Sequence, residues 1–502
     1  MLFLKKKSLL IIIVATFLLI IRIWFALTHV TFSQDQARDL FIVESFIENN
    51  QFFIGYGPKT SVGGFFVFPL YYQLMLFIHV IFKHPISMNL FITVLESLTP
   101  IVLYKLLRIF FCKSSSLIGS AIYSFSFLVV LFSTSAWSPN LTPLTSMLTL
   151  YFSMNYLVNN HKRSLFWIAI SALLGAHFHF QFMALVPLLT MVLLVSIARE
   201  KSNLKYWIRG IIVASISYFP YLFFEFNNNW MNTIAIINFF FVEHTQIYER
   251  VSKAEYLLSF FPSFFERFLF GYNLPNFVIG YLIYYFGAIS LFEKGLRNKD
   301  LKWLLICMGL LVISLRLFKG DKLDYYLMFM FFMPILFITS IVDHLNKFKL
   351  IVILPLFFIL GYQLNITSFN DFHYLLNTFF KVESNQKIQD VHLIVHNLDK
   401  ANSYIYFFEK SKKISLNRNS SIILEICDDY HQCQETNNKQ CFINPVATFA
   451  SSIKDANNII SEPITKDDKI SIWIAESSSQ KIIPDIVSTI EERADLINNE
   501  IN

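Results

Sequence analysis

The residues best suited to chemistry lie in a polar segment that follows the first hydrophobic stretch of the chain. Asp35, Arg38 and Asp39 come close together there. Charged groups are costly inside lipid and cheap at its surface, so two carboxylates beside a guanidinium suggest a reaction centre at the mouth of a membrane protein. Asp35 and Asp39 are four residues apart and share one face if the segment enters a helix. The simpler alternative is a helix N-cap at Ser33 or Asp35 with a surface ion pair.

The composition indicates an integral membrane protein. Of the 502 residues, 55% are hydrophobic, only 15% are charged and 56 are Phe, whereas soluble domains average about 25% charged residues. Apolar segments of about 17–25 residues, each long enough to cross a hydrocarbon core of roughly 30 Å, follow one another up to about residue 365. The first of them lacks a small-residue cleavage site, so we expect an anchor and not a removed signal peptide.

The net charge of +6 resides in short Lys and Arg clusters between the apolar segments. No basic face is interleaved with aromatic residues, so no nucleic-acid partner is expected. By the positive-inside rule, all clusters face the cytoplasm if residues 65–82 lie along the outer surface; if that segment spanned, every cluster after the first would lie outside. We therefore expect an interfacial helix there. The clusters are Lys5 to Lys7; Lys105, Arg108 and Lys113; Lys162 and Arg163; Arg199, Lys201, Lys205 and Arg209; Lys294, Arg297, Lys299 and Lys302; and Lys347 and Lys349.

This topology predicts an all-α polytopic protein of the cell membrane, with about eleven transmembrane helices and interfacial helices in the first outer loop. The N-terminus is expected in the cytoplasm. The polar chemistry collects on the outer face. The expected spans lie near residues 9–28, 86–107, 114–133, 142–159, 164–176, 182–198, 207–225, 274–292, 302–317, 325–343 and 350–366, and the outer segments are 29–64, 133–140, 176–181, 226–272 and 318–324.

From about residue 370 the chain becomes polar, with short β-branched runs at 422–426 and 470–474 that predict strands. We expect a transmembrane domain over residues 1–370 and a small α+β extracytoplasmic domain over residues 371–502. An outer location permits a disulfide among Cys427, Cys433 and Cys441, whose pairing the spacing does not determine. A zinc site would need a fourth ligand such as His431, and the spacing fits no structural zinc pattern.

The first outer loop resembles that of the prokaryotic C-superfamily glycosyltransferases related to protein O-mannosyltransferases and lipid A aminoarabinose transferases. The shared features are an Asp followed three residues later by Arg, a Gly/Pro-containing turn at residues 55–60, and an interfacial helix bearing Pro-Leu-Tyr-Tyr at residues 69–72. The order of spans continues the resemblance to about residue 366, including the outward turn at residues 137–140.

The resemblance implies catalytic roles within this loop. The outer-loop Asp is the catalytic residue of that family, and it corresponds to Asp35. The family often has Glu directly after this Asp, where the present chain has Gln36. A second acid is therefore missing at that position, and Asp39 is the candidate to serve instead.

Transfer of a sugar from a lipid phosphate requires a base for the acceptor hydroxyl and stabilisation of the departing phosphate. We expect Asp35 to be the base. Cations at the outer ends of spans can meet a phosphate at headgroup level, although long side chains also reach the interface simply by snorkelling. The expected donor-phosphate ligands are Arg38, Lys59, Arg316, Lys319 and Lys322.

A polyprenyl tail needs an apolar groove beside a polar pocket, so we expect a cavity open to the outer leaflet. Asn140 either binds a sugar hydroxyl or caps the next span. Glu225 resembles a family position that faces the cavity. His177 and His179 favour interfacial hydrogen bonds over a metal site, because no third ligand is evident. The residues assigned to the cavity are Tyr71, Tyr72, Asn140, His177, His179, Glu225, Tyr325 and Tyr326.

The expected function is glycosyl transfer from a polyprenyl-phosphate-linked donor to a hydroxyl of a glycan, lipid or protein. No metal or cofactor is indicated, although a divalent cation is left open. The lack of a nucleotide-binding fingerprint argues against an ATP-driven function. A lipid or polysaccharide transporter or flippase is one alternative, but one-sided polarity without repeated halves fits surface chemistry better. A surface-polysaccharide polymerase or ligase is a second alternative. Such an enzyme is expected to have a large outer loop late in the chain, and the segment 226–272 is large enough to be that loop.

Overall fold

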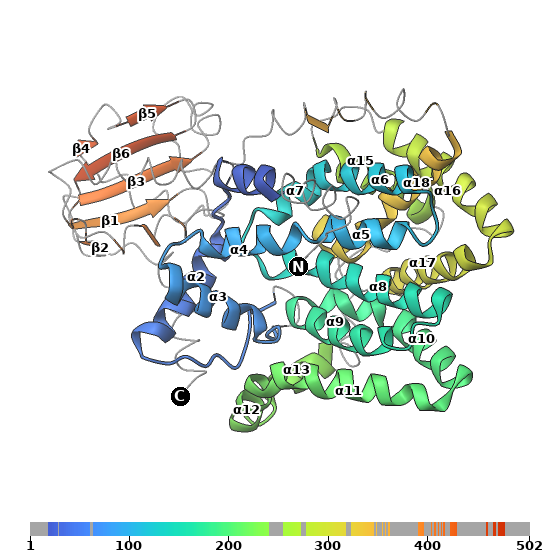
Figure 1. Ribbon diagram of the computed structural model, residues 1–502. Helices are drawn as coiled ribbons and strands as arrows, with labels where there is room; N and C mark the ends of the chain where they lie inside the picture. The colour runs from blue at the N-terminus through green and yellow to red at the C-terminus, as the bar shows by residue number, and fades with distance from the viewer. Residues whose placement is uncertain are drawn as a thin grey trace, which may run out of the picture. The chain divides into compact units, whose positions relative to one another are not determined.

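The computed structural model describes residues 19–28, 30–60, 64–239, 255–272, 278–317 and 323–345, together with short stretches farther along the chain (Figure 1). Its contacts divide the chain into two compact units. The membrane unit comprises Met1–Thr31 and Asp39–Asn370, and the C-terminal unit comprises Phe32–Arg38 and Asp371–Asn502. The division after Asn370 falls where the composition changes from apolar to polar.

The membrane unit is a bundle of helices, as expected for a polytopic membrane protein. Helix α2 begins in the C-terminal unit and continues into the membrane unit. The α-helices are α2 (Gln34–Glu48), α3 (Leu70–Phe82), α4 (Ser87–Glu96), α5 (Thr99–Leu107), α6 (Lys113–Phe125), α7 (Phe127–Ser133), α8 (Thr142–Asn159), α9 (Ser164–Phe178), α10 (Val186–Arg199), α11 (Leu204–Ser215), α12 (Phe219–Asn227), α13 (Met231–Ile237), α15 (Phe261–Phe270), α16 (Val278–Arg297), α17 (Lys299–Leu317) and α18 (Phe332–Leu345), with shorter turns at η1 (Ser138–Leu141), η2 (Phe180–Leu185) and η7 (Asp324–Met330).

Local sequence explains where several helices begin and end. Proline occupies the first turn of α5, α8, α10, α12 and α15, where its missing N–H costs no intrahelical hydrogen bond. Asn160 follows α8 in the left-handed conformation, with φ 53°, and its N–H donates to the last turn of the helix. Asn tolerates this conformation better than most residues, so it makes a suitable helix end.

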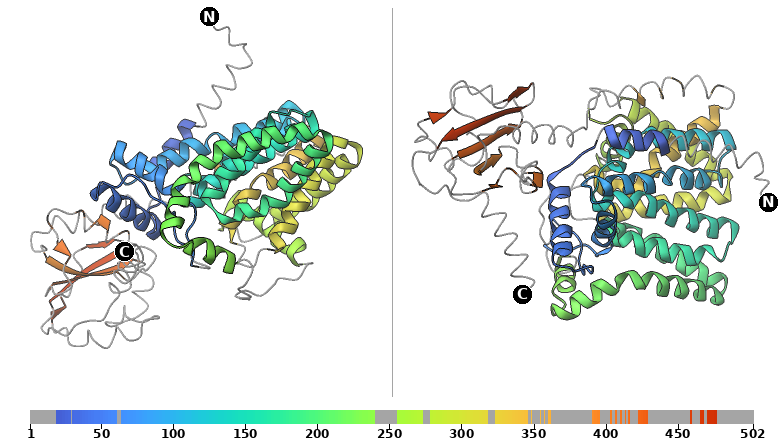
Figure 2. Two further views of the ribbon diagram at one scale, coloured as in Figure 1. Left: turned by 90° about the horizontal axis from the view of Figure 1, so that it is seen from below. Right: turned by 60° about the vertical axis from the view of Figure 1, so that its left-hand side comes forward.

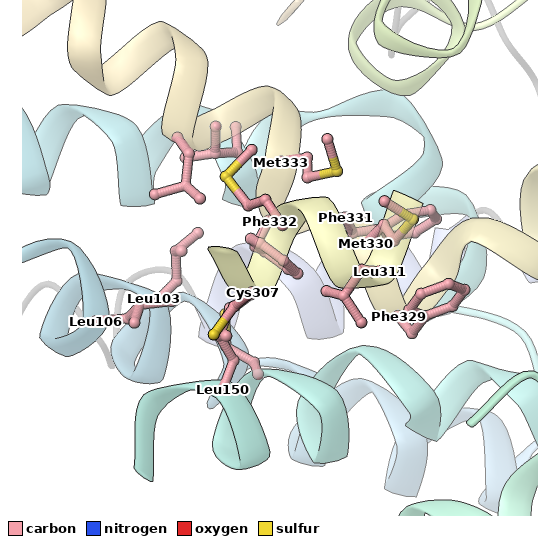
Figure 3. Close-up of a cluster of buried hydrophobic side chains, with 14 of the residues drawn as sticks. Leu103, Leu106, Leu150, Cys307, Leu311, Phe329, Met330, Phe331, Phe332 and Met333 are labelled. Carbon is pink, nitrogen blue, oxygen red and sulfur yellow. The ribbon is translucent and has the colours of Figure 1, made fainter. Parts of the chain in front are cut away.

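The core of the bundle lies where α5, α8, α17, η7 and α18 meet. Figure 3 shows Leu103 and Leu106 of α5 near Leu150 of α8 and Cys307 of α17, all fully or almost fully buried. Close helix approach also depends on glycine: a methyl group at Gly287 of α16 would lie 2.5 Å from Cβ of Phe337 in α18. Small residues at such contacts let helix backbones approach closely within a membrane.

Three helical stretches within the described residues are long and apolar enough to cross a membrane, and the number rises to five if two bent pairs are each taken as one span. The single stretches are Ser87–Leu107, Phe180–Arg199 and Lys201–Asn227; the bent pairs are Lys113–Phe125 with Phe127–Ser133 and Asp324–Met330 with Phe332–Leu345. All five coincide with predicted spans. The count of about eleven stays a prediction, since residues 1–18 and most of 350–366 lie outside the described part.

The helix expected at the interface is short. Helix α3 has 13 residues, which at about 1.5 Å per residue makes roughly 20 Å, less than the hydrocarbon thickness. In the right-hand view of Figure 2, helices α2 and α3 lie at one end of the bundle and run across the direction of its long helices. This arrangement suits a helix that lies along the membrane surface.

The C-terminal unit contains a mixed sheet. Strands β1 (Asp390–Val395) and β2 (Ser415–Leu416) pair in parallel, as do β1 and β3 (Ile422–Asp428), while β3 pairs with β6 (Ile470–Glu476) in antiparallel register from Ile422 opposite Glu476 to Asp428 opposite Ile470. Strands β4 (Asn458–Ile459) and β5 (Thr465–Asp467) also pair with β6. The predicted strands at 422–426 and 470–474 are confirmed. Cys433, Cys441 and His431 lie outside the described residues.

The topology provides a first test. In a cysteine-free background, a cysteine introduced at the exposed Lys299 should resist membrane-impermeant thiol reagents in intact cells and react after the membrane is opened, because the positive-inside rule places this end of α17 in the cytoplasm. A cysteine introduced at Glu48 of the first outer loop is the matched control and should react from outside. Labelling of the Lys299 position in intact cells would overturn the predicted topology.

Candidate active site

Asp35 lies on the first turn of α2 and forms an ion pair with Arg38. Oδ1 of Asp35 is 2.6 Å from Nη1 of Arg38, and the two side chains are 42% and 34% exposed. The positive end of the helix dipole favours a carboxylate on this turn. Asp35 is therefore an accessible carboxyl group beside a cation, and a carboxylate at this place could accept a proton.

Gln36 has a clear structural role in place of the Glu found in the resembled family. Its Oε1 accepts the N–H of Ser33 at 3.0 Å, which is half of a capping box with Ser33 as the N-cap residue. The predicted cap at Ser33 thus coexists with the Asp35–Arg38 pair. Phe32, one residue earlier, packs its ring against Tyr406 and Phe407 of the same C-terminal unit, and its carbonyl accepts from Oγ of Ser403 at 2.9 Å.

Asp39, one helical turn after Asp35, has a different environment. Its side chain is fully buried, and its carboxylate accepts from the hydroxyl of Tyr72 in α3 at 2.8 Å. Farther along the same helices, Glu44 forms a second link with Nε2 of His79 at 3.1 Å. These two contacts tie α2 to α3. The role of Asp39 as a second acid stays a prediction, and the structure shows that its carboxylate holds α3 through Tyr72.

Residues of two predicted outer turns and of the start of the predicted span 325–343 come together in one aromatic cluster. The ring of Tyr325 lies 4.8 Å from Trp137, and the ring of His179 lies 6.3 Å from Tyr325 and 5.5 Å from Tyr326. Both tyrosines and His179 are partly exposed. Aromatic faces of this kind pack against the apolar faces of sugars and lipids, so the cluster suits the predicted substrate cavity.

An ion pair that the sequence analysis missed adjoins this cluster. Asp324, which precedes the two tyrosines, receives two hydrogen bonds from Nε and one from Nη2 of Arg267 at 2.8–3.1 Å, and one from the Tyr272 hydroxyl at 2.8 Å. Partial burial disfavours the Arg267 cation, but the bonds to Asp324 outweigh it and raise the pKa of Arg267. Burial and the Asp324 charge raise the pKa of Tyr272, so its hydroxyl stays a donor.

A sequence signal for this pair exists. Glu266 and Arg267 are adjacent charged residues in the stretch Phe-Phe-Glu-Arg-Phe-Leu-Phe, and ionisable groups in strongly apolar surroundings need partners. Arg22 gives the same signal within the first apolar stretch. It is buried, and its Nη1 donates to the carbonyl of Glu96 at 3.0 Å. The Glu96 carboxylate in turn accepts from Oγ1 of Thr99 and from the N–H of Leu144, so this buried carboxylate also has hydrogen-bond partners.

The other assigned cavity residues are buried, and hydrogen bonds within the protein hold Asn140, His177 and Tyr72. Asn140 donates to the carbonyl and hydroxyl of Ser135 at 2.8 and 2.7 Å, which holds the 137–140 turn. Nε2 of His177 lies 2.8 Å from Oγ of Ser217, which is a hydrogen bond of the kind expected for this residue. His177 ends α9 and His179 follows it in extended conformation, so the two rings contact different neighbours. Tyr71 and Tyr72 are almost fully buried.

Glu225 differs most from its expected place. Its side chain is fully buried, and its two oxygens accept the N–H groups of Asn232 and Thr233 at 3.3 and 2.8 Å. It therefore caps the start of α13 instead of facing an open cavity. The reason is physical: a buried carboxylate is stable only when hydrogen bonds replace its hydration.

Only some of the predicted phosphate ligands lie in the described part of the chain. Lys59 is exposed, with Nζ 5.7 Å from the centre of the Phe66 ring. Arg316 lies in α17, but its side chain is outside the described part, as are Lys319 and Lys322 altogether. Among the described residues no cluster of three or more His, Cys, Asp or Glu side chains suits a metal ion.

Comparison with known proteins finds several that are similar to this chain. Residues 68–224 match the family model described as dolichyl-phosphate-mannose-protein mannosyltransferase. The structure is similar to ArnT from Cupriavidus metallidurans bound to undecaprenyl phosphate, with a TM-score of 0.53 at 10% identity over 94% of this chain and 98% of that chain. ArnT in the apo state gives 0.54 at 9% identity over 93% and 98%. No curated protein sequence matches the chain.

The fold is thus that of a polytopic helical membrane protein of the ArnT type. The resemblance inferred from the first outer loop, to the C-superfamily glycosyltransferases related to protein O-mannosyltransferases and lipid A aminoarabinose transferases, is confirmed. The matched segment begins just before α3, the helix that follows this loop, and ends within α12.

Proposed function

We propose that this protein transfers a sugar from a polyprenyl-phosphate-linked donor to an acceptor hydroxyl at the outer face of the membrane. The observation that carries the proposal is the accessible Asp35–Arg38 pair on the first turn of α2, in the loop that precedes the family-matched segment. An ArnT relative binds undecaprenyl phosphate, and the matched family is described by its dolichyl-phosphate-mannose donor. Both descriptions support a lipid-phosphate sugar donor.

In the proposed reaction, Asp35 accepts the proton of the acceptor hydroxyl as the hydroxyl oxygen attacks the anomeric carbon. The new bond joins that oxygen to the anomeric carbon, and the bond from the anomeric carbon to the phosphate oxygen breaks. The phosphate leaves with the electron pair of that bond, still attached to its polyprenyl chain. A single displacement of this kind inverts the anomeric configuration. General-base catalysis of this step contributes about 10²–10⁴-fold to the rate.

The departing phosphate carries negative charge that cations must stabilise. Arg38, Lys59 and Arg316 are the proposed ligands, with Lys319 and Lys322 as further candidates. Arg267 is another described cation of the outer region, but its bidentate pair with Asp324 already neutralises it. Lys59, which is exposed, is a described candidate for the phosphate ligand within the membrane unit.

The proposal is tested in vesicles that contain the purified protein and a polyprenyl-phosphate donor with a radiolabelled sugar. We expect release of polyprenyl phosphate together with labelled acceptor when an acceptor preparation from the cell envelope is added. Movement of intact labelled donor across the bilayer without release of polyprenyl phosphate would instead identify a flippase. A polymerase or ligase that uses other lipid carriers would leave this donor unchanged.

A further inference from the structure

The backbone around Lys59 forms a short antiparallel hairpin. Lys59 lies opposite Phe66, and the flanking hydrogen bonds run from the Thr60 N–H to the Phe65 carbonyl at 2.8 Å and from the Val67 N–H to the Pro58 carbonyl at 2.9 Å. In such a pair the two opposed residues make no hydrogen bond to each other, so the N–H and carbonyl of Phe66 point away from the Lys59 strand. A two-stranded hairpin is only marginally stable by itself, so it needs external support.

Asn232 of α13 supplies that support. Its Oδ1 accepts the Phe66 N–H at 2.5 Å, and its Nδ2 donates to the Phe66 carbonyl at 3.0 Å. One side chain thus satisfies both outward backbone groups of Phe66, as a third strand would. Asn232 is 1% exposed, so water does not compete for these bonds.

Asn232 is itself held from the preceding helix. Glu225 of α12 accepts the Asn232 N–H and the adjacent Thr233 N–H with its two carboxylate oxygens. The Tyr221 hydroxyl lies 3.3 Å from Nδ2 of Asn232 and 3.0 Å from Oγ1 of Thr233. Helices α12 and α13 follow each other in the chain (Figure 1), and the buried carboxylate fixes the start of the second relative to the end of the first.

We propose that Asn232 is a positioning residue for Lys59. Glu225 orients Asn232, Asn232 clamps the backbone of Phe66, and the hairpin holds Lys59 opposite Phe66 where the cation receives the donor phosphate. That the ligand of Lys59 is a lipid phosphate rests on the proposed function. The positioning of Lys59 by Asn232 rests on the hydrogen bonds alone. It also gives the buried Glu225 a purpose that a cavity-lining role does not explain.

The test compares Asn232→Ala with Asn228→Ala. Asn228 belongs to the same inter-helix turn, but among the described residues its Nδ2 donates to the Phe224 carbonyl of α12 and not to the hairpin. In reconstituted full-length protein with a polyprenyl-phosphate sugar donor, Asn232→Ala should raise the KM for the donor about tenfold and also lower kcat, since the two lost hydrogen bonds position the cation that holds the phosphate both when it is bound and when it departs. Asn228→Ala should change neither constant.

A double variant separates positioning from general damage. Lys59→Ala should raise the donor KM, and adding Asn232→Ala to it should raise the KM no further, because both changes remove the same interaction. Additive effects, or a Lys59→Ala protein with wild-type KM, would overturn the proposal. If Asn232→Ala does not fold, Glu225→Gln replaces it, because glutamine has the same size as the capping glutamate. Glu225→Gln should raise the donor KM of the protein that has Lys59, and it should not raise the donor KM of the Lys59→Ala protein.

Hydrogen exchange tests the clamp without any transfer assay. The hydrogen-bonded backbone amides of Gly57, Thr60, Phe66 and Val67 should exchange at least tenfold faster in Asn232→Ala than in the wild type, and at the wild-type rate in Asn228→Ala, because loss of the clamp frees the hairpin. Equal exchange in all three proteins would refute the clamp. A protein that releases no polyprenyl phosphate but shows the faster exchange would refute the proposed function and leave the clamp standing.

Discussion

Replacement of Asp35 by Asn is expected to lower the rate of sugar transfer by about 10²–10⁴-fold. The amide keeps the size and polarity of the carboxylate but cannot take the proton of the acceptor hydroxyl. Donor binding should stay near the wild-type level, because Asp35 carries no positive charge for the phosphate. Single-turnover transfer and equilibrium binding of the lipid donor, measured on the same reconstituted protein, separate the two effects.

Two further variants make this result specific. Glu48→Gln removes an exposed carboxylate at the opposite end of α2 and should transfer sugar at the wild-type rate. Arg316→Ala should weaken donor binding, because it removes a charge partner of the phosphate. A folded Asp35→Asn protein that transfers sugar at the wild-type rate would show the base assignment to be wrong, and Asp39 would be tested next.

Loss of Asp324 should produce the largest effect on stability. Asp324 is 5% exposed and holds Arg267 through both carboxylate oxygens, with Tyr272 as a third partner. Asp324→Ala leaves the Arg267 cation, itself only 22% exposed, without its carboxylate. Breaking one side of a buried pair costs on the order of 3–5 kcal/mol. We expect a clearly lower unfolding temperature in detergent than for the wild type.

An exposed ion pair provides the control for this experiment. Glu293 and Arg297 are 2.8 Å apart on α16, and their side chains are 47% and 80% exposed. Glu293→Gln should leave the unfolding temperature almost unchanged, since exposed pairs contribute little. The double variant Asp324→Leu with Arg267→Met should recover part of the lost stability because it removes both charges. Equal small shifts for Asp324→Ala and Glu293→Gln would contradict a supporting role for the Arg267–Asp324 pair.

The sequence alone predicted the features that depend on local composition. Long apolar segments located the spans that the structure describes, because crossing a hydrocarbon core requires a minimum length of apolar helix. The β-branched runs at 422–426 and 470–474 located two paired strands. The first-loop motif indicated the resemblance to a glycosyltransferase family, since Asp35, Arg38 and the Tyr71–Tyr72 pair lie in one stretch of the chain and their spacing is visible without a structure.

Only the tertiary structure decided which polar residues are partners and which are accessible. Asp35 and Asp39 look equivalent in the sequence, yet one is 42% exposed and the other is buried against Tyr72. Glu225, expected to face a cavity, caps α13, and Arg267 pairs with Asp324 across 57 residues of chain. The physical reason is that a buried charge needs hydrogen bonds from whatever groups the packing of helices brings near, and those groups are distant in sequence.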